Sequence, residues 1–201
     1  MEKDIVEQLI EKIRQLETDL RHELQKKQDD FFYRIDRKKV RFEKEARKQH
    51  RQLKKKVRLF LKEAPILHYL TAPIIWSIIL PTLLLDTFVS VFQYICFPLY
   101  KIPKVKRSRY IIIDRHALGY LNIIEKINCI YCGYFNGLMA YIQEVAARTE
   151  QYWCPIKHAR RVGYTHNRYK YFFDYGDGEG YRKKLEEVRR DFADVKKEGR
   201  Q

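Results

Sequence analysis

The hydrophobic positions divide this chain into three regions that differ in pattern. Residues 2–62 contain neither Gly nor Pro, and the absence of these two helix breakers over so long a stretch favours a continuous helix. The early apolar positions recur at alternating steps of three and four, which is the spacing of a short coiled-coil stripe. The members of this stripe are Val6, Leu9, Ile13, Leu16 and Leu20. We therefore predict a long amphipathic, coiled-coil-like helix over residues 1–62.

Further along this region the apolar spacing changes to eleven residues. Two sets follow it: Phe31, Phe42 and Leu53, and Ile35, Ala46 and Val57. An eleven-residue repeat corresponds to about 3.67 residues per turn, so each set would stay on one face of a straight helix. An unbroken helix of this length would reach roughly 90 Å. Such an arm would pair with a second copy or with a partner helix. The alternatives are a helix folded back on the rest of the protein and a charged helix that is simply solvated.

Residues 64–100 form an apolar block without Lys, Arg or Glu. About 20 helical residues cross a hydrocarbon core of roughly 30 Å, so the block is nearly twice as long as one crossing needs. Pro81 lies near its middle, where it would end one helix and begin another. We predict a membrane-inserted hairpin or re-entrant loop. A single tilted span kinked at Pro81 and a buried soluble core are the alternatives.

Positive charge flanks the apolar block on both sides. The chain has a formal net charge of +15; residues 31–63 hold 14 Lys/Arg against 4 Asp/Glu, and residues 101–201 hold 21 against 12. Because basic flanks tend to stay on the cytosolic face of a membrane, we expect both termini to be cytoplasmic. The basic residues near the block are candidates for contact with anionic lipid headgroups. They are Lys54, Lys55, Lys56, Arg58, Lys104, Lys106 and Arg107.

Asp86 is the only formally charged residue of the apolar block. An ionisable side chain at membrane depth is costly and often marks a functional position. In a hairpin, Asp86 would lie close to the turn, where it would cap the second helix or approach the far headgroups. We therefore favour a structural role for Asp86, with a functional role as the alternative.

Two pairs of potential metal ligands follow the block. Cys129 and Cys132 form a C-x2-C pair followed by Gly133, and Cys154 and His158 form a C-x3-H pair. A C-x2-C pair can bind one metal when the backbone forms a tight turn, and residues four apart project from one side of a helical turn. The full spacing supplies four ligands of the types that zinc takes in structural sites. We predict structural zinc; iron or an iron–sulfur cluster, a redox pair, and ordinary buried cysteines are the alternatives.

Around these ligand pairs we expect a small cytosol-facing helical domain over residues 101–201. A helix that begins with Asn136 as its N-cap would connect the two pairs. A final amphipathic helix over residues 181–197 would carry one apolar stripe. This stripe comprises Leu185, Val188, Phe192 and Val195.

Sequence signatures of catalysis are weak. The chain contains no nucleophile elbow, no phosphate-binding Gly loop and no HExxH motif. Glu125 and Glu144 are the acid–base candidates nearest the cysteines, although Glu144 and Arg148 have the spacing of an ordinary helix-stabilising pair. We therefore expect a binding or scaffold function, with an enzymatic role as the alternative.

These patterns together predict a mainly α protein with a long N-terminal helix, a membrane-inserted hairpin and a metal-stapled helical C-terminal domain. We expect a membrane-anchored, zinc-binding scaffold or complex subunit that oligomerises through residues 1–62. The first alternative is a membrane-associated metalloenzyme or redox protein that uses the Cys/His/Glu cluster on a lipid-soluble substrate. The second is a basic RNA-binding protein.

Overall fold

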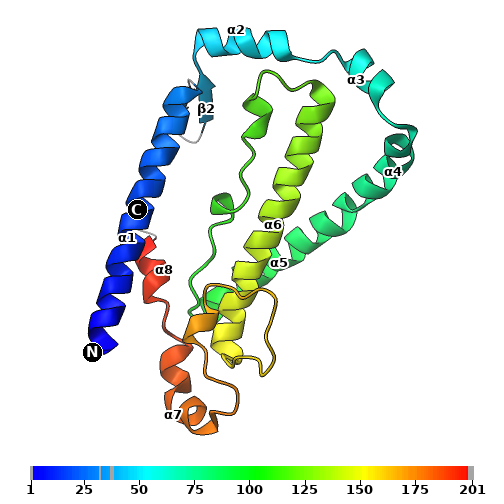
Figure 1. Ribbon diagram of the computed structural model, residues 1–201. Coiled ribbons are helices and arrows are strands. Elements are labelled where there is room, and N and C mark those ends of the chain that lie inside the picture. Colours follow the sequence, from blue (N-terminus) through cyan, green and yellow to red (C-terminus); the bar gives the residue numbers. More distant parts are fainter. Residues whose placement is uncertain (1, 32, 37–38, 199–201) are drawn as a thin grey trace. The chain divides into compact units, whose positions relative to one another are not determined.

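The computed structural model describes residues 2–31, 33–36 and 39–198. The protein is mainly helical (Figure 1), which confirms the expected fold class. The chain forms two compact units. The N-terminal unit comprises Met1–Glu63 and Asp114–Cys129, and the C-terminal unit comprises Ala64–Ile113 and Ile130–Gln201. Each unit is therefore built from two separate stretches of the chain.

The N-terminal unit begins with helix α1 (Glu2–Asp30). The helix expected over residues 1–62 therefore already ends at Asp30. The antiparallel strands β1 (Tyr33–Asp36) and β2 (Lys39–Phe42) follow, and then the helices α2 (Lys44–Leu53) and α3 (Val57–Glu63). Leu16 and Leu20 of the α1 stripe are exposed. The side chains of the other stripe members lie outside the described residues. They are Val6, Leu9 and Ile13.

The two strands form because apolar and polar residues alternate in this stretch. Tyr33 and Ile35 in β1, and Val40 and Phe42 in β2, occupy every second position, which is the period of a strand. Aromatic and β-branched residues also fit a pleated surface well. The register pairs Tyr33 with Phe42 and Ile35 with Val40, and it brings the two aromatic rings to 5.8 Å. This hairpin interrupts the predicted helix.

One of the two sets spaced by eleven lies around a cavity rather than along one helix. Phe31, Phe42 and Leu53 line a cavity of about 700 Å³ within the N-terminal unit. Its other lining residues are Tyr33, Val40, Gln49, His50, Asp114, Arg115, Leu118 and Tyr120. The cavity therefore draws on both chain stretches of this unit.

His50 of α2 holds these two stretches together. Its ring centroid lies 4.8 Å from that of Phe42 and 5.1 Å from that of Tyr120, in edge-on contacts. Gly119 leaves the room that His50 needs, since a Cβ at Gly119 would lie 3.0 Å from the His50 Cβ. The short 3-10 helix η2 (Arg115–Ala117) precedes this contact.

The apolar block of the C-terminal unit forms helices α4 (Ile66–Ser77) and α5 (Ile79–Leu99). Ile78 joins them with helical dihedrals, φ −63° and ψ −19°, so the chain continues from α4 into α5 without the reversal that a hairpin needs. Pro81 is the third residue of α5, where a backbone N–H has no helical partner in any case. The stretch from Ile66 to Leu99 is long and apolar enough to cross a membrane. The hairpin itself is not confirmed.

Helix α6 (Ile123–Trp153) is capped by Asn122 and not by Asn136. The Asn122 Oδ1 accepts hydrogen bonds from the backbone N–H groups of Ile124 (2.9 Å) and Glu125 (3.1 Å). The Glu125 carboxylate accepts one from the Asn122 N–H in return, at 2.8 Å. This reciprocal arrangement is a capping box. Asn136 lies inside the helix, where its Nδ2 donates to the Cys132 carbonyl.

The core of the C-terminal unit lies between α5, α6 and the connection that follows α5 (Figure 1). This connection contains the 3-10 helix η1 (Arg107–Arg109). The backbone of the connection packs on α6 at Gly137, and a Cβ added to Gly137 would lie only 2.6 Å from the Tyr110 carbonyl oxygen. The buried core residues are Phe97, Ile102, Val105, Leu138, Tyr141, Val145 and Phe192.

The predicted C-terminal helix over 181–197 is divided in two. Helix α7 (Gly178–Val188) is capped by Asp177, whose Oδ1 accepts from the Gly180 N–H at 2.8 Å. Helix α8 (Ala193–Glu198) follows after a break. The break allows Phe192 to enter the core, where its side chain is 2% exposed. Before α7, the 3-10 helix η3 (Tyr169–Tyr171) and a bridge between Ile156 and Phe173 order the loop.

Candidate functional site

The first candidate site is an apolar surface on α4 and the beginning of α5. Between Ile66 and Leu85 the chain has no charged residue, and Thr82 is the only buried one. Ile66, Ile74 and Leu80 are 80%, 70% and 67% exposed. Apolar side chains therefore face outward on every side of this helical stretch. A helix that is hydrophobic all round and yet unburied is typical of a segment whose solvent is lipid.

The second half of α5 has two different sides. Gln93 and Phe97 are buried towards α6, whereas Phe88, Tyr94 and Leu99 are exposed. The buried side is partly polar: the Gln93 Nε2 donates to the Tyr141 hydroxyl at 2.9 Å, and its Oε1 accepts from the Val105 N–H at 2.6 Å. The exposed side continues the apolar surface of α4.

Asp86 is paired with groups from two other segments. Its Oδ2 accepts from the Arg107 Nη2 at 2.6 Å and from the Tyr134 hydroxyl at 2.8 Å, and its Oδ1 accepts from Ser90 at 3.2 Å. The hydrogen bond to Asp86 raises the pKa of Arg107 above its usual value. Burial first, and then Asp86, raises the pKa of Tyr134. Asp86 therefore connects α5 to η1 and α6, which supports the structural reading of this residue.

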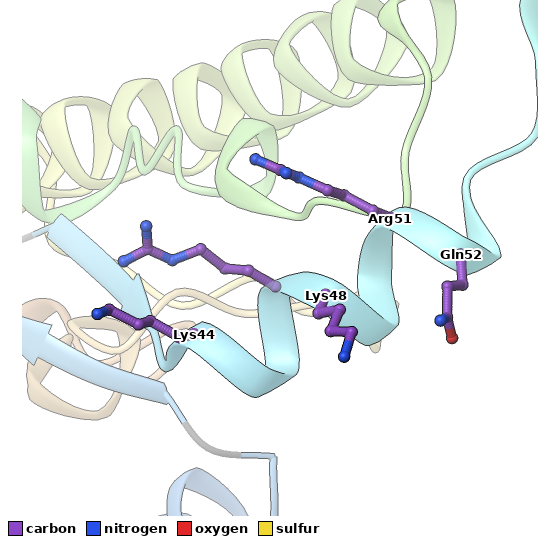
Figure 2. A pocket seen from close by; sticks show the side chains of 5 residues that line it. Lys44, Lys48, Arg51 and Gln52 are labelled. Atoms are coloured by element: carbon purple, nitrogen blue, oxygen red, sulfur yellow. The ribbon is translucent and has the colours of Figure 1, made fainter.

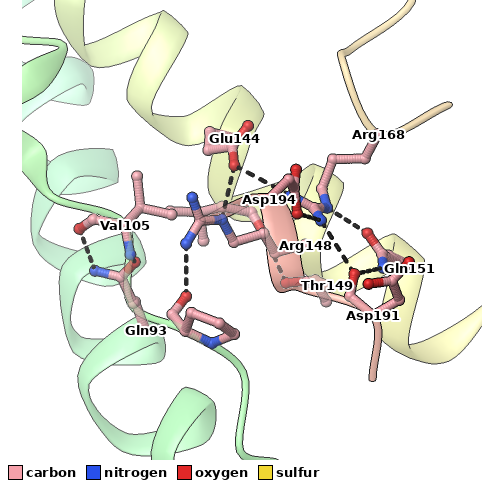
Figure 3. A network of polar contacts seen from close by, with 11 residues as sticks. Gln93, Val105, Glu144, Arg148, Thr149, Gln151, Arg168, Asp191 and Asp194 are labelled. Carbon is pink, nitrogen blue, oxygen red and sulfur yellow. Dashed lines mark hydrogen bonds and ion pairs between the residues drawn. The ribbon is translucent and has the colours of Figure 1, made fainter. Parts of the chain in front are cut away.

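A charged network lies deeper in the C-terminal unit, and Figure 3 shows it at the end of α6. The Arg148 side chain donates to Glu144 at 2.7 Å and to the Pro103 carbonyl at 2.8 Å. Arg168, only 2% exposed, donates to Gln151 and to Asp194, the latter at 3.1 Å. Buried charges persist when they are paired and hydrogen-bonded in this way.

This network and the capping box account for both acid–base candidates. Glu144 neutralises Arg148 and lies 4.0 Å from Arg168, and Glu125 caps α6. Each carboxylate is therefore engaged in holding the fold. This arrangement gives no support to an acid–base role for either residue.

The four proposed metal ligands are not brought together. Cys132 lies within α6 and Cys154 just beyond its end; the step of 22 residues from one to the other corresponds to about 33 Å of helix. Cys129 lies one turn before Cys132 on the same helix. The His158 ring stacks on Tyr169. Among the residues that the structure describes, no three His, Cys, Asp or Glu side chains are grouped so that they could hold a metal ion.

Cys154 lies beside an apolar groove. Burial first, and then the Glu150 carboxylate, raises the pKa of the Cys154 thiol, and Glu150 itself lies 3.0 Å from the His166 Nε2. A raised pKa lowers the thiolate fraction, so this thiol is a weak nucleophile. The groove, of about 470 Å³, is lined by Val89, Phe92, Ile142, Val145, Ala146, Thr149, Glu150, Trp153 and Cys154.

Several of the predicted lipid-contacting cations already have partners. Lys55 is paired with Glu63, Arg107 with Asp86, and Lys104 lies 4.4 Å from the centre of the Tyr94 ring. The remaining candidates are exposed. They are Lys54, Lys56, Arg58 and Lys106.

The sequence contained a signal for the packing of α6 that the predictions did not use. Gly133 and Gly137 are four residues apart, a small-xxx-small spacing that permits close backbone approach on one face of a helix. In this structure the partner is not a second helix but the backbone of Tyr110, Ile111 and Ile112. A search for this spacing would have marked this face of α6 as one of close contact.

Comparisons of the chain with protein-family models, with curated proteins and with solved structures found no match. The functional argument therefore rests on the geometry of this molecule.

Proposed function

We propose that this protein is a non-enzymatic, membrane-anchored scaffold or complex subunit. The observation that carries the proposal is the uncharged, outward-facing apolar surface between Ile66 and Leu85, in which Thr82 alone is buried. Soluble monomers rarely leave a contiguous apolar surface of this size in water. A lipid layer is the surrounding that such a surface fits.

The composition of the N-terminal unit supports entry and exit of the chain on one side of the membrane. This unit combines residues before the apolar block with residues after it, through the contact of His50 with Tyr120. Two stretches that pack on one another in this way must lie on the same side of a lipid layer. The basic flanks favour the cytosolic side, with both termini cytoplasmic.

The continuous path from α4 to α5 supports a placement of the helix along the membrane. A helix without reversal can have both ends on one face only if it stays within one leaflet of the lipid layer. Because α4 is apolar on every side, we place it below the headgroups, among the acyl chains of the cytosolic leaflet, together with the exposed side of α5. The partly polar side of α5 then faces the C-terminal unit.

Helix α1 is the proposed attachment point for a second copy or a partner helix. Leu16, Leu20 and Leu24 are 60%, 59% and 50% exposed along one face of α1. Residues four apart share a helix face, so these leucines form an apolar stripe suited to helix pairing. The anchor and the arm together are what a scaffold requires.

The anchoring is tested by carbonate extraction of membranes that contain the full-length chain. The variant I74R/L80R places two arginines in the apolar surface, each of which costs up to about 3 kcal/mol in a lipid environment and stays charged at the alkaline pH of carbonate. The matched control, I35R/L59R, changes two exposed apolar residues of the N-terminal unit. The native chain and the control should stay in the membrane pellet, and I74R/L80R should be extracted. A native chain that is soluble without detergent would refute the anchoring.

A structural zinc ion is the second proposal, and the C-x2-C and C-x3-H spacing supports it. The observed course of α6 requires either that the helix opens or that two copies share the metal through Cys129, Cys132, Cys154 and His158. Elemental analysis of the detergent-purified chain decides the matter. Zinc that is retained by the native chain and lost in both C132S and C154S would support the centre. Iron with visible absorption would instead indicate the redox alternative.

A further inference from the structure

Helix α2 has two faces of opposite character. One face is turned towards the cavity of the N-terminal unit: Ala46 is buried there, and Gln49, His50 and Leu53 line the cavity. The opposite face carries residues at positions i, i+3, i+4, i+7 and i+8, which share one side of a helix. They are Lys44, Arg47, Lys48, Arg51 and Gln52, and together they line an open groove of about 420 Å³ (Figure 2).

The four cations of this groove have no acidic partner in the part of the chain that the structure describes. Among these residues, none of Lys44, Arg47, Lys48 and Arg51 makes an ion pair. The Arg47 Nε donates to the Phe42 carbonyl at 2.9 Å, which holds the guanidinium in place through a neutral acceptor. A concentrated, unpaired cationic face favours an anionic partner.

We propose that this face of α2 binds the phosphate headgroups of anionic lipids. The inference rests on the proposed membrane anchoring, and charge complementarity identifies the partner. Only 12 residues lie between the end of α2 and the start of α4. A chain segment this short allows α2 to contact the same membrane surface as the anchor. Basic segments close to a membrane anchor are attracted to the negative cytosolic leaflet in this manner.

The groove is suited to headgroups rather than to RNA. Single-stranded RNA is usually held by aromatic side chains on which its bases stack. The groove on α2 has no aromatic residue among its lining residues. The nearby rings of Phe42, His50 and Tyr120 pack on one another in the N-terminal unit. Phosphate contact without base stacking therefore describes the chemistry of this face.

The experiment is cell-free synthesis of the full-length chain in the presence of vesicles, followed by flotation. One vesicle type contains phosphatidylcholine alone, and the other contains about one third phosphatidylglycerol. The test variant is K44Q/R47Q/K48Q/R51Q. The matched control, R182Q/K183Q/K184Q/R190Q, removes the same charge from exposed positions of α7 and its end. The readout is the ratio of partitioning onto the two vesicle types.

The native chain should float with both vesicle types and prefer the anionic one. Each basic residue near an anionic surface strengthens partitioning roughly fivefold, so the test variant should lose at least about tenfold of this preference. The control should keep it, and both should retain native flotation with phosphatidylcholine. Equal loss in test and control would reduce the effect to net charge and overturn the inference. The inference would also be overturned if added RNA displaced the chain from anionic vesicles when the RNA phosphate concentration was below the lipid phosphate concentration.

Failure of the underlying proposal looks different. A native chain that does not float with phosphatidylcholine vesicles contradicts the membrane anchor itself. A chain that floats equally with both vesicle types keeps the anchor and loses only the headgroup site on α2.

Discussion

At the scale of single residues, Asp86 shows how a charge is accommodated in an apolar block. Its carboxylate has partners on η1, on α6 and one turn along α5. Arg107 remains 48% exposed while Asp86 is 13% exposed, so the pair lies at the edge of the C-terminal unit. Such a position allows Arg107 to neutralise Asp86 and still reach water or headgroups.

We predict that Asp86→Asn destabilises the chain in detergent by about 1–2 kcal/mol, a range set by the loss of charged hydrogen bonds and by the partial exposure of Arg107. The melting temperature should fall by several degrees. Ser90→Ala, which removes only the 3.2 Å hydrogen bond, is the matched control and should change it little. If Arg107→Gln has the same effect alone and adds nothing to Asp86→Asn, the two residues act as a pair. An Asp86→Asn chain as stable as the native one would contradict this account.

Gly137 and Gly133 should respond oppositely to alanine. In Gly137→Ala the new Cβ would lie 2.6 Å from the Tyr110 oxygen and 2.8 Å from the Ile111 Cα, both backbone atoms. Overpacking of this kind costs about 1–3 kcal/mol. In Gly133→Ala the Cβ meets only the Ile112 oxygen at 3.4 Å, so the gain in helix propensity, up to about 1 kcal/mol, should prevail. Thermal unfolding measures the change in melting temperature, which should be negative for Gly137→Ala and positive for Gly133→Ala. Equal changes in the two variants would exclude the close contact of Gly137 with the backbone of Tyr110 and Ile111.

At the scale of elements, helix α1 exposes the apolar side chains of Leu16, Leu20 and Leu24. We predict that the full-length chain is oligomeric in detergent and that L16D/L20D makes it monomeric, because two aspartates would be desolvated in a helix–helix seam. H22D/Q25D adds the same charge on the other side of α1 and should leave the oligomer intact. Light scattering after size exclusion measures the mass. A monomeric native chain would contradict this prediction and indicate that the leucine stripe of α1 does not pair with a second copy.

The elements that the sequence predicted are those with a local cause. The periodicity of α1 and the composition of residues 64–100 each lie within one segment, and both were read correctly as helical and apolar. The β1–β2 hairpin was missed because its alternating pattern covers few residues and the absence of Gly and Pro outweighed it. Pro81 was taken for a break, but the first turn of a helix tolerates proline. C-x2-C fits a metal knuckle and one helical turn equally well, so its spacing alone did not reveal that α6 is continuous.

At the scale of the whole molecule, the decisive contacts join residues far apart in the chain. His50 meets Tyr120, and Asp86 meets Arg107 and Tyr134. No periodicity records such pairings, which is why the sequence predicted the charged flanks of the block but not the unit that residues 1–63 form with residues 114–129. The polar contacts of the C-terminal unit also join distant residues, since Arg168 donates hydrogen bonds to Gln151 and Asp194.

The pairing of distant stretches yields a prediction about sidedness. In a chain without its four native cysteines, Lys62→Cys and His116→Cys place exposed thiols before and after the apolar block. Because α2 and residues 114–120 pack on one another, a membrane-impermeant maleimide added to intact cells should label neither thiol, and permeabilisation should expose both. Labelling of one thiol alone would mean that the chain crosses the membrane once and that the contact of His50 with Tyr120 is absent in the cell. Labelling of both without permeabilisation would keep the one-sided anchor and reverse its orientation, since the packing of the N-terminal unit fixes only that the two positions share a side.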